Sequence, residues 1–236
     1  MEECISVFDM LKIGVGPSSS HTLGPWRAAE RFLDELKENN KLELVNYIKV
    51  DLYGSLSLTG KGHATDLAVM LGLSGQDPEY IPVESIGRII DEINSKKIIK
   101  LANQITIPFF PDENIIFNRE FLPFHANGIK FTASLLDAEE YSSTFYSIGG
   151  GFVVKEERNN AKKKHQIKCA FPYPIQNAEE LLKYCNELNK SISEVVFENE
   201  KSMRSEDEIH NELMRIWNTM LECMYIGCHS EGVLPG

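Results

Sequence analysis

The spacing of apolar residues constrains the fold most, because it changes from helical to alternating and back along the chain. Apolar side chains recur every three or four positions in residues 25–39, which predicts an amphipathic helix. Apolar and polar residues alternate in 45–53, which predicts a half-buried strand. Similar patterns predict helices at 67–71 and 82–97 and strands at 105–109, 115–117, 129–135 and 145–154. Since these elements lack a regular strand–helix alternation, we expect an α+β fold with helices packed on a mainly antiparallel sheet.

The last quarter of the chain is predicted to be entirely helical. Asn177 and Glu180 have the spacing of a capping box and predict the start of a helix over 178–188. Apolar spacing predicts two more helices, over 191–200 and about 206–226. We therefore expect an α+β domain over residues 1–175 and a helical segment over 176–236.

Composition excludes several classes of function. The 236 residues include 24 Lys and Arg against 35 Asp and Glu, a net charge of −11, which argues against a nucleic-acid or anionic-membrane partner. No apolar run reaches the roughly 18–20 residues that span a membrane. The first nine residues lack the basic region of a signal peptide. Five scattered cysteines fit a reducing compartment, and we expect a cytoplasmic protein.

Two sequence features hint weakly at ion or phosphate binding. Cys223 and Cys228 form a C-x4-C pair without companion ligands, so we expect buried, inert thiols on a helix and no metal site. The basic run 162–165 lies between strand-like segments and beside acidic residues. A solvated hairpin tip explains this run better than a phosphate site does.

The segment Gly16–Thr22 concentrates the strongest local chemistry. It contains Ser18, Ser19, Ser20, His21 and Thr22 at the expected start of the helix over 25–39. Unpaired N–H groups at a helix start attract anions, and hydroxyls add hydrogen bonds, so a carboxylate or phosphate could bind there. An equally good interpretation is a helix cap with His21 merely packed against it.

A second glycine-punctuated turn, 59–66, places His63 at another predicted helix start. Imidazole is the usual general base near neutral pH, although a single histidine in a turn is more often a surface residue. His125 lies in a third such turn, and three similar turns favour one convergent small-molecule site. The spacing does not match a phosphate-binding P-loop.

A triple glycine, Gly149–Gly151, interrupts the strand pattern of 145–154. Glycine inside a strand indicates close approach of the backbone to another group, or a mobile flap.

Taken together, four segments carry a family resemblance. Residues 6–25, 53–66, 125–128 and 146–152 resemble, in this order, the β-region of iron–sulfur-dependent L-serine dehydratases. Residues 185–236 look like the opening of the catalytic α-region of that family. The cluster-binding cysteines of the family lie farther along the α-region, so the resemblance implies that this chain stops inside a motif, at 232–236, and lacks them.

The resemblance implies conversion of L-serine to pyruvate and ammonia with a [4Fe-4S] cluster and without pyridoxal phosphate. It also implies a place in amino-acid metabolism and gluconeogenesis, and a homodimer. By carry-over, His63 is the base that removes the α-proton, and His125 orients its neighbours. The remaining implied substrate-binding residues are Ser18, Ser19, Ser20, His21, Thr22 and Asn127, with Gly149, Gly150 and Gly151 as a flexible cover.

Two further expectations follow from the resemblance. The chain needs the catalytic α-region, in cis or in trans, and alone is expected to be inactive. The alternative is a regulatory serine-binding module, because the β-region of this family also resembles the allosteric domains of some serine-pathway dehydrogenases. A sensor needs no base near the α-carbon, so in that case His63, His125 and Asn127 would not converge.

Overall fold

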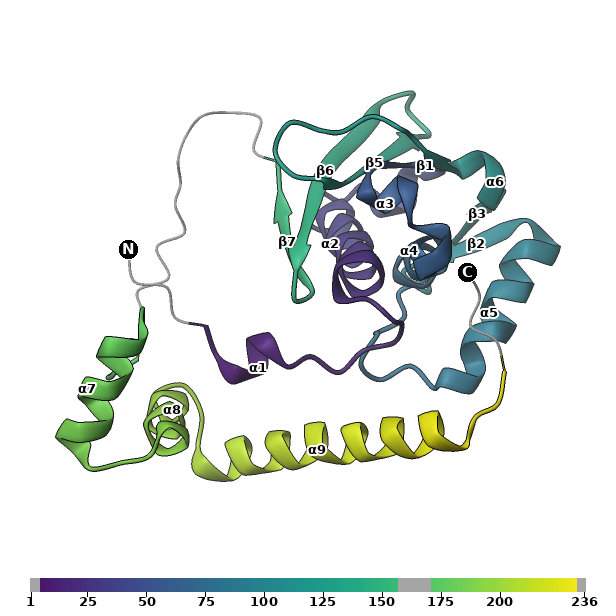
Figure 1. Cartoon of the computed structure of the whole chain (residues 1–236). Helices are drawn as coiled ribbons and strands as arrows, with labels where there is room; N and C mark the ends of the chain where they lie inside the picture. The colour runs from purple at the N-terminus through teal and green to yellow at the C-terminus, as the bar shows by residue number, and fades with distance from the viewer. Residues whose placement is uncertain (1–4, 157–170, 233–236) are drawn as a thin grey trace. The chain divides into compact units, whose positions relative to one another are not determined.

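The computed structural model describes residues 5–156 and 171–232, which form two compact units (Figure 1). The larger unit contains described residues 13–156, and the smaller contains 5–12 and 171–232. The predicted boundary at residue 175 is not tested by this division and stays a prediction. The Lys162–Lys164 run, His165, Cys4 and Cys169 lie outside the described residues.

A five-stranded sheet with the order β4-β1-β5-β6-β7 forms the centre of the larger unit. Strand β4 pairs parallel with β1, and every other pairing in the sheet is antiparallel, which confirms the predicted α+β class. The bounds of the strands are β1 Val45–Gly54, β4 Ile115–Phe117, β5 Asn127–Leu135, β6 Glu140–Gly149 and β7 Phe152–Lys155.

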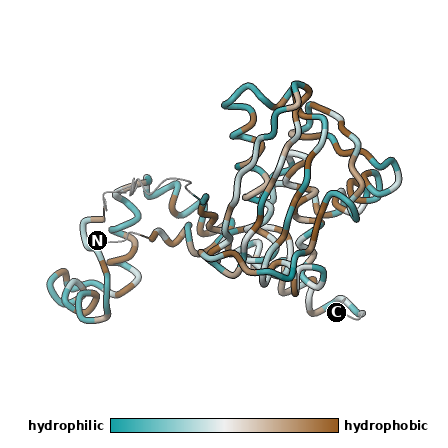
Figure 2. Tube along the Cα trace, turned by 90° about the horizontal axis from the view of Figure 1, so that it is seen from above, coloured by the Kyte–Doolittle hydropathy of each residue, from teal (hydrophilic) through white to brown (hydrophobic). Residues whose placement is uncertain are grey.

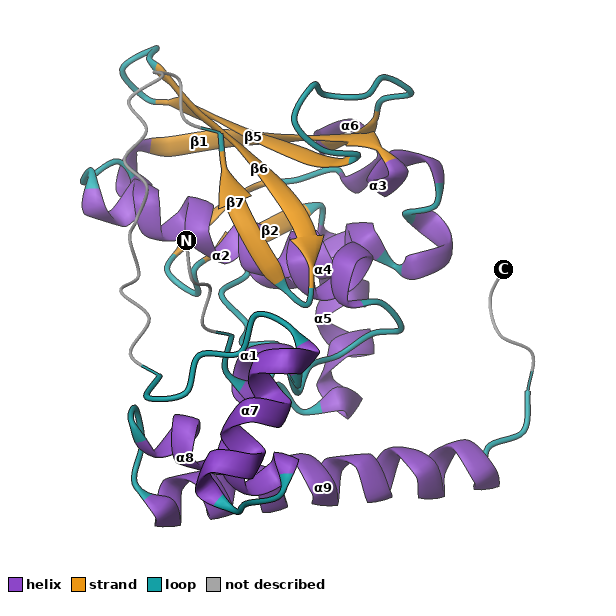
Figure 3. Cartoon of the chain, turned by 60° about the vertical axis from the view of Figure 1, so that its left-hand side comes forward, coloured by secondary structure: helices purple, strands orange, loops and turns teal. Residues whose placement is uncertain are grey.

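Helices α2 (Gly24–Glu38) and α4 (Thr65–Leu73) cover one face of this sheet (Figure 3). Hydrophobic and hydrophilic stretches alternate along the strands, as Figure 2 shows. The apolar stripe of α2 enters the core, where Phe32 stacks on Phe131 of β5 with ring centroids 5.1 Å apart. Trp26 is fully buried and donates its indole N–H to the carbonyl of Gln76. These contacts fix the start of α2, and therefore the turn that precedes it, against the sheet.

The rest of the larger unit connects these layers. Helix α5 (Val83–Lys96) leads into a two-stranded sheet of β2 (Ile98–Leu101) and β3 (Ile105–Pro108). Two short helices, α3 (Ser55–Leu58) and α6 (Pro111–Asn114), follow β1 and β3. The sequence pattern missed β2 and α3, because the adjacent Ile98 and Ile99 break the alternation of a strand, and a single helical turn is too short to display a helical period.

The strand predicted over 145–154 is instead a hairpin. Strands β6 and β7 pair antiparallel, and Gly149–Gly151 form the turn between them with φ values of 98°, 59° and 76°. Positive φ is the conformation that glycine adopts without steric cost, so the triple glycine is turn chemistry.

The smaller unit is helical, as predicted. Its helices are α1 (Val7–Met10), α7 (Ala178–Leu188), α8 (Ile192–Lys201) and α9 (Glu206–His229). Asn177 caps α7, and capping boxes begin α8 and α9. The expectation of buried thiols is wrong: Cys223 and Cys228 are exposed, because α9 buries only Ile209.

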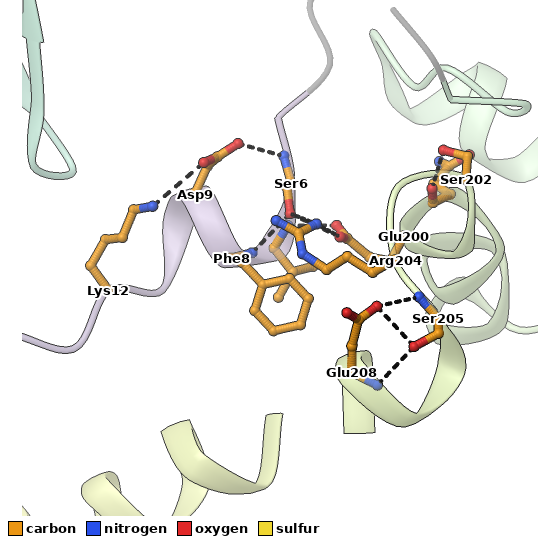
Figure 4. Close-up of polar contacts among 11 residues, drawn as sticks. Ser6, Phe8, Asp9, Lys12, Glu200, Ser202, Arg204, Ser205 and Glu208 are labelled. Atoms are coloured by element: carbon orange, nitrogen blue, oxygen red, sulfur yellow. Dashed lines mark hydrogen bonds and ion pairs between the residues drawn. The ribbon is translucent and has the colours of Figure 1, made fainter. Parts of the chain in front are cut away.

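A buried carboxylate near the end of α8 ties α1 to α8 and to the turn that follows it (Figure 4). Glu200 accepts hydrogen bonds from the Ser6 hydroxyl and the Val7 amide, both at 2.8 Å, and from the Arg204 guanidinium at 3.0 Å. That guanidinium also lies 4.8 Å from the centre of the Phe8 ring. Because Glu200 is only 3% exposed, these donors compensate for its lost hydration.

Among the described residues, no helix is both long enough and apolar enough to cross a membrane.

Candidate active site

The first predicted site turn is a wide turn that runs directly into α2. Residues Ser19–Leu23 form a π-helical turn, labelled η1, and α2 begins at Gly24. The Ser18 hydroxyl caps the turn by accepting the His21 amide at 3.3 Å. Ser18 therefore caps η1, whereas α2 itself follows Leu23 without the predicted side-chain cap, because η1 runs directly into it.

The second predicted turn brings His63 to the start of α4. Residues Lys61–His63 form a 3-10 turn, η3, and Ala64 takes a left-handed conformation with φ 54° before α4 begins at Thr65. The Thr65 amide closes the turn on the carbonyl of Gly60 at 2.9 Å.

Two buried threonines join these turns in a reciprocal manner. The Thr22 hydroxyl donates to the His63 carbonyl at 2.9 Å, and the Thr65 hydroxyl donates to the His21 carbonyl at 2.6 Å. Each threonine thus holds the backbone of the histidine in the opposite turn. Thr22 was expected to bind substrate, but its hydroxyl proton is used here. The sequence reasoning assigned Thr65 no role, since a hydroxyl at a helix start is ordinary capping chemistry.

The joined turns bring the two imidazoles together. The ring centroids of His21 and His63 are 4.9 Å apart, with their planes tilted by 36°. Nδ1 of His63 lies 2.9 Å from the Thr59 carbonyl, which can only accept a hydrogen bond. Neutral His63 therefore carries its proton on Nδ1 and a lone pair on Nε2, which is the form of a general base.

His21 is held at both ring nitrogens. Nδ1 lies 2.9 Å from the Ser20 hydroxyl, and Nε2 lies 2.9 Å from the Ser55 hydroxyl. Burial lowers the pKa of His21, the positive charge of protonated His63 lowers it further, and a hydrogen bond with Ser55 opposes both effects in part. A lowered pKa keeps His21 neutral at pH 7.

A third segment, at the start of β5 in the sheet, is linked by hydrogen bonds to the first site turn. Asn127, the buried first residue of β5, donates its side-chain amide to the Ser147 carbonyl at 3.1 Å. The fully buried Ser147 hydroxyl donates to the Ser20 carbonyl at 2.8 Å. Ser147 therefore links Asn127 to the first turn. Its role was not predicted, because a lone serine in a strand has no distinguishing pattern.

His125 lies in the turn that leads into β5. Its Nδ1 accepts the backbone amide of Asn127 at 3.1 Å, so the ring shapes the turn that leads into β5. The role of His125 as a residue that orients its neighbours stays a prediction.

The glycine turn between β6 and β7 lies close to the first site turn. A Cβ atom on Gly151 would come within 2.7 Å of the Leu23 side chain, which directly follows Thr22. Gly149, by contrast, has open space where its Cβ would be. The expected close approach of the backbone is thus found at Gly151.

The described residues offer no ligand set for a metal. No group of three or more His, Cys, Asp or Glu side chains comes together in residues 5–156 and 171–232. The three free cysteines in this range are Cys185, Cys223 and Cys228.

Comparison with known proteins shows the family of the chain. Residues 6–158 match the family model described as "Serine dehydratase beta chain". The chain is similar to "L-serine dehydratase" of Haemophilus influenzae (42% identical), "L-serine dehydratase 1" of Escherichia coli (43%) and "L-serine dehydratase" of Streptomyces coelicolor (43%). Each match covers 98% of this chain but 51% of the relative, so the chain spans about half the length of these relatives. The chain belongs to the serine dehydratase beta chain family.

Proposed function

We propose that this chain is part of an L-serine dehydratase, an L-serine ammonia-lyase, and supplies its substrate-binding groups and its base. One observation carries the proposal: Nδ1 of His63 is hydrogen-bonded to the Thr59 carbonyl, which leaves the lone pair of the neutral ring on Nε2. A binding module would need no such base. The relatives that span the chain are named L-serine dehydratases, which supports an enzyme over a sensor.

In the proposed reaction, Nε2 of His63 removes the α-proton of L-serine. The electron pair of the Cα–H bond forms the Cα–Cβ double bond as the Cβ–O bond breaks, and the β-hydroxyl leaves as hydroxide and is protonated to water. The resulting aminoacrylate tautomerises to an imine, and water releases pyruvate and ammonia. General-base catalysis of this kind contributes about 10²- to 10⁴-fold to a rate.

The substrate carboxylate is assigned to the first turn. The N–H groups at a helix start lack intrahelical acceptors and attract anions, which favours the amides and hydroxyls of Ser18, Ser19 and Ser20. Asn127 uses one side-chain N–H on Ser147 and has a second for the carboxylate. We assign Thr22 to holding the turns together, because its hydroxyl already donates to His63.

The remaining assignments complete the site. His125 positions Asn127 through the contact with its amide, and Gly149 and Gly150 belong to the turn that would cover the bound substrate.

The proposal includes a [4Fe-4S] cluster and no pyridoxal phosphate. The described residues do not fit a cluster, since no ligand set forms among them, and we assign its ligands to polypeptide beyond residues 1–236. We derive no reaction step through it. The complete enzyme is proposed to be a cytoplasmic homodimer that combines this chain with a catalytic α-region, acts in amino-acid metabolism and gluconeogenesis, and binds neither nucleic acid nor membranes.

The base assignment is tested with His63→Ala. Binding of L-serine to the 236-residue chain is measured by isothermal titration calorimetry. Pyruvate release is measured after the chain is combined, under anaerobic conditions, with the remaining half of Escherichia coli L-serine dehydratase 1. We expect serine affinity to change less than threefold and turnover to fall by about 100-fold or more, because a base acts in the transition state.

The conservative variant His125→Gln serves as the comparison. It is expected to weaken serine binding through Asn127 while retaining measurable turnover. Near-normal turnover by His63→Ala would rule out His63 as the base, and a chain that binds no L-serine would contradict the substrate assignment.

A further inference from the structure

Ser55 occupies the point where the three segments of the site meet. It begins α3 directly after β1, and its amide donates to the Ala126 carbonyl at 2.8 Å, one residue before Asn127. The preceding Gly54 has φ 57°, and a Cβ there would lie 2.3 Å from the same carbonyl. The backbone at Ser55 is therefore fixed against the turn that leads into β5.

The Ser55 side chain fixes His21. Its hydroxyl lies 2.9 Å from Nε2 of His21, while Ser20 engages Nδ1 at the same distance. With a hydroxyl at each ring nitrogen, the imidazole cannot flip or rotate without losing both hydrogen bonds. Ser20 is the neighbour of His21 in the chain, so Ser55 is the partner that ties the ring to another element.

The Ser55 backbone acts on His63 through Thr59. The Ser55 carbonyl accepts the Thr59 amide at 3.1 Å and the Thr59 hydroxyl at 3.0 Å. The Thr59 carbonyl in turn accepts Nδ1–H of His63 at 2.9 Å. The same residue therefore supports the contact that leaves the lone pair of His63 on Nε2.

We propose that Ser55 is a positioning residue for both histidines, holding the His21 ring through its hydroxyl and the His63 tautomer through its carbonyl and Thr59. This inference rests on the proposed function for its consequence in serine binding. The geometry that it describes does not depend on that function.

The test uses the 236-residue chain with Ser55→Ala and measures the imidazole ¹⁵N chemical shifts by long-range ¹H–¹⁵N NMR. We expect the two ring nitrogens of His21 to change their shifts as the ring samples both tautomers. The His63 shifts should stay those of an Nδ1–H ring, because the carbonyl of residue 55 remains. Ser55→Thr keeps the hydroxyl and should restore the His21 shifts.

The matched control is Ser57→Ala. Ser57 shares α3 and is half-buried, but its hydroxyl makes no hydrogen bond within the part of the chain that the structure describes. We expect both histidines to keep their shifts in this variant. Unchanged His21 shifts in Ser55→Ala, with the fold retained by circular dichroism, would overturn the proposal.

Serine binding separates this inference from the proposed function. We expect Ser55→Ala to weaken the Kd for L-serine about tenfold, the effect of one lost positioning hydrogen bond, and Ser57→Ala to leave it unchanged. If the unmodified chain binds no L-serine, the proposed function fails, and the His21 shifts still decide whether Ser55 positions the ring.

Discussion

At the scale of single residues, the site depends on positions where tight packing leaves no space for a larger side chain. Gly24 is the clearest case, because it begins α2 with ordinary helical geometry and lies against Ser147. A Cβ at Gly24 would come within 1.9 Å of the Ser147 Oγ and 2.6 Å of its Cβ. That hydroxyl holds the Ser20 carbonyl, so packing at Gly24 and polar contacts in the site turn are coupled.

We predict that Gly24→Ala lowers the free energy of unfolding by about 1–3 kcal/mol, because the added methyl overpacks this contact. Gly87→Ala is the control, since a Cβ at Gly87 in α5 meets nothing within 4 Å. It should raise stability by about 0.5–1 kcal/mol through helix propensity. Urea denaturation measures both, and equal stability of Gly24→Ala and the unmodified chain would contradict the packing argument.

At the scale of elements, the reciprocal threonine contacts join η1 and η3 at the starts of two helices. The Thr22 and Thr65 hydroxyls are buried and donate to backbone carbonyls of the opposite turn. The distance between the two histidines therefore depends on contacts that touch neither imidazole.

Thr22→Val and Thr65→Val each retain the side-chain shape and remove one hydrogen bond. We predict a loss of stability of about 1–2 kcal/mol for each, because a part-buried carbonyl loses its hydrogen-bond donor. The double variant should lose less stability than the sum of the two single losses, since either change weakens the same contact between η1 and η3. A double-mutant cycle from chemical denaturation gives the coupling, and additivity within about 0.3 kcal/mol would show that the contacts act independently.

At the scale of the whole molecule, each unit is closed by contacts between distant parts of the chain. In the smaller unit, Glu200 binds Ser6 and Val7 from the opposite end of the sequence and Arg204 from the turn before α9. The helical unit is therefore not complete without the first residues of the chain.

Replacement of Glu200 by alanine is predicted to release the segment around α1. The variant removes charge-assisted hydrogen bonds of about 1.5–3 kcal/mol each before relaxation, so hydrogen exchange at the Val7 amide should accelerate at least tenfold. Glu222→Ala, at an exposed position of α9, should leave this exchange unchanged. Equal Val7 exchange rates in the unmodified chain and Glu200→Ala would mean that other contacts hold the segment.

Local chemistry explains why most elements could be predicted. The helix over 178–188 has the predicted bounds, because the capping residue Asn177 and the apolar spacing both act within a few residues. Strand β1 was also predicted, since Ile48, Val50 and Leu52 alternate with polar residues. All three side chains are fully buried in the structure. The hairpin at Gly149–Gly151 was misjudged, because a strand pattern on both sides conceals the reversal of direction.

The sequence by itself determined the family resemblance, the α+β class, most helix and strand positions, and the residue types of the candidate site. Only the tertiary structure decided how those residues meet: the Thr22 contact with His63 spans 41 positions, and that of Ser147 with Ser20 spans 127. The tautomer of neutral His63 was also decided only by the tertiary structure, through its hydrogen bond to the Thr59 carbonyl. A hydroxyl or carbonyl has no periodic signature, so its partner is set by packing of the core, which brings distant turns within hydrogen-bonding distance.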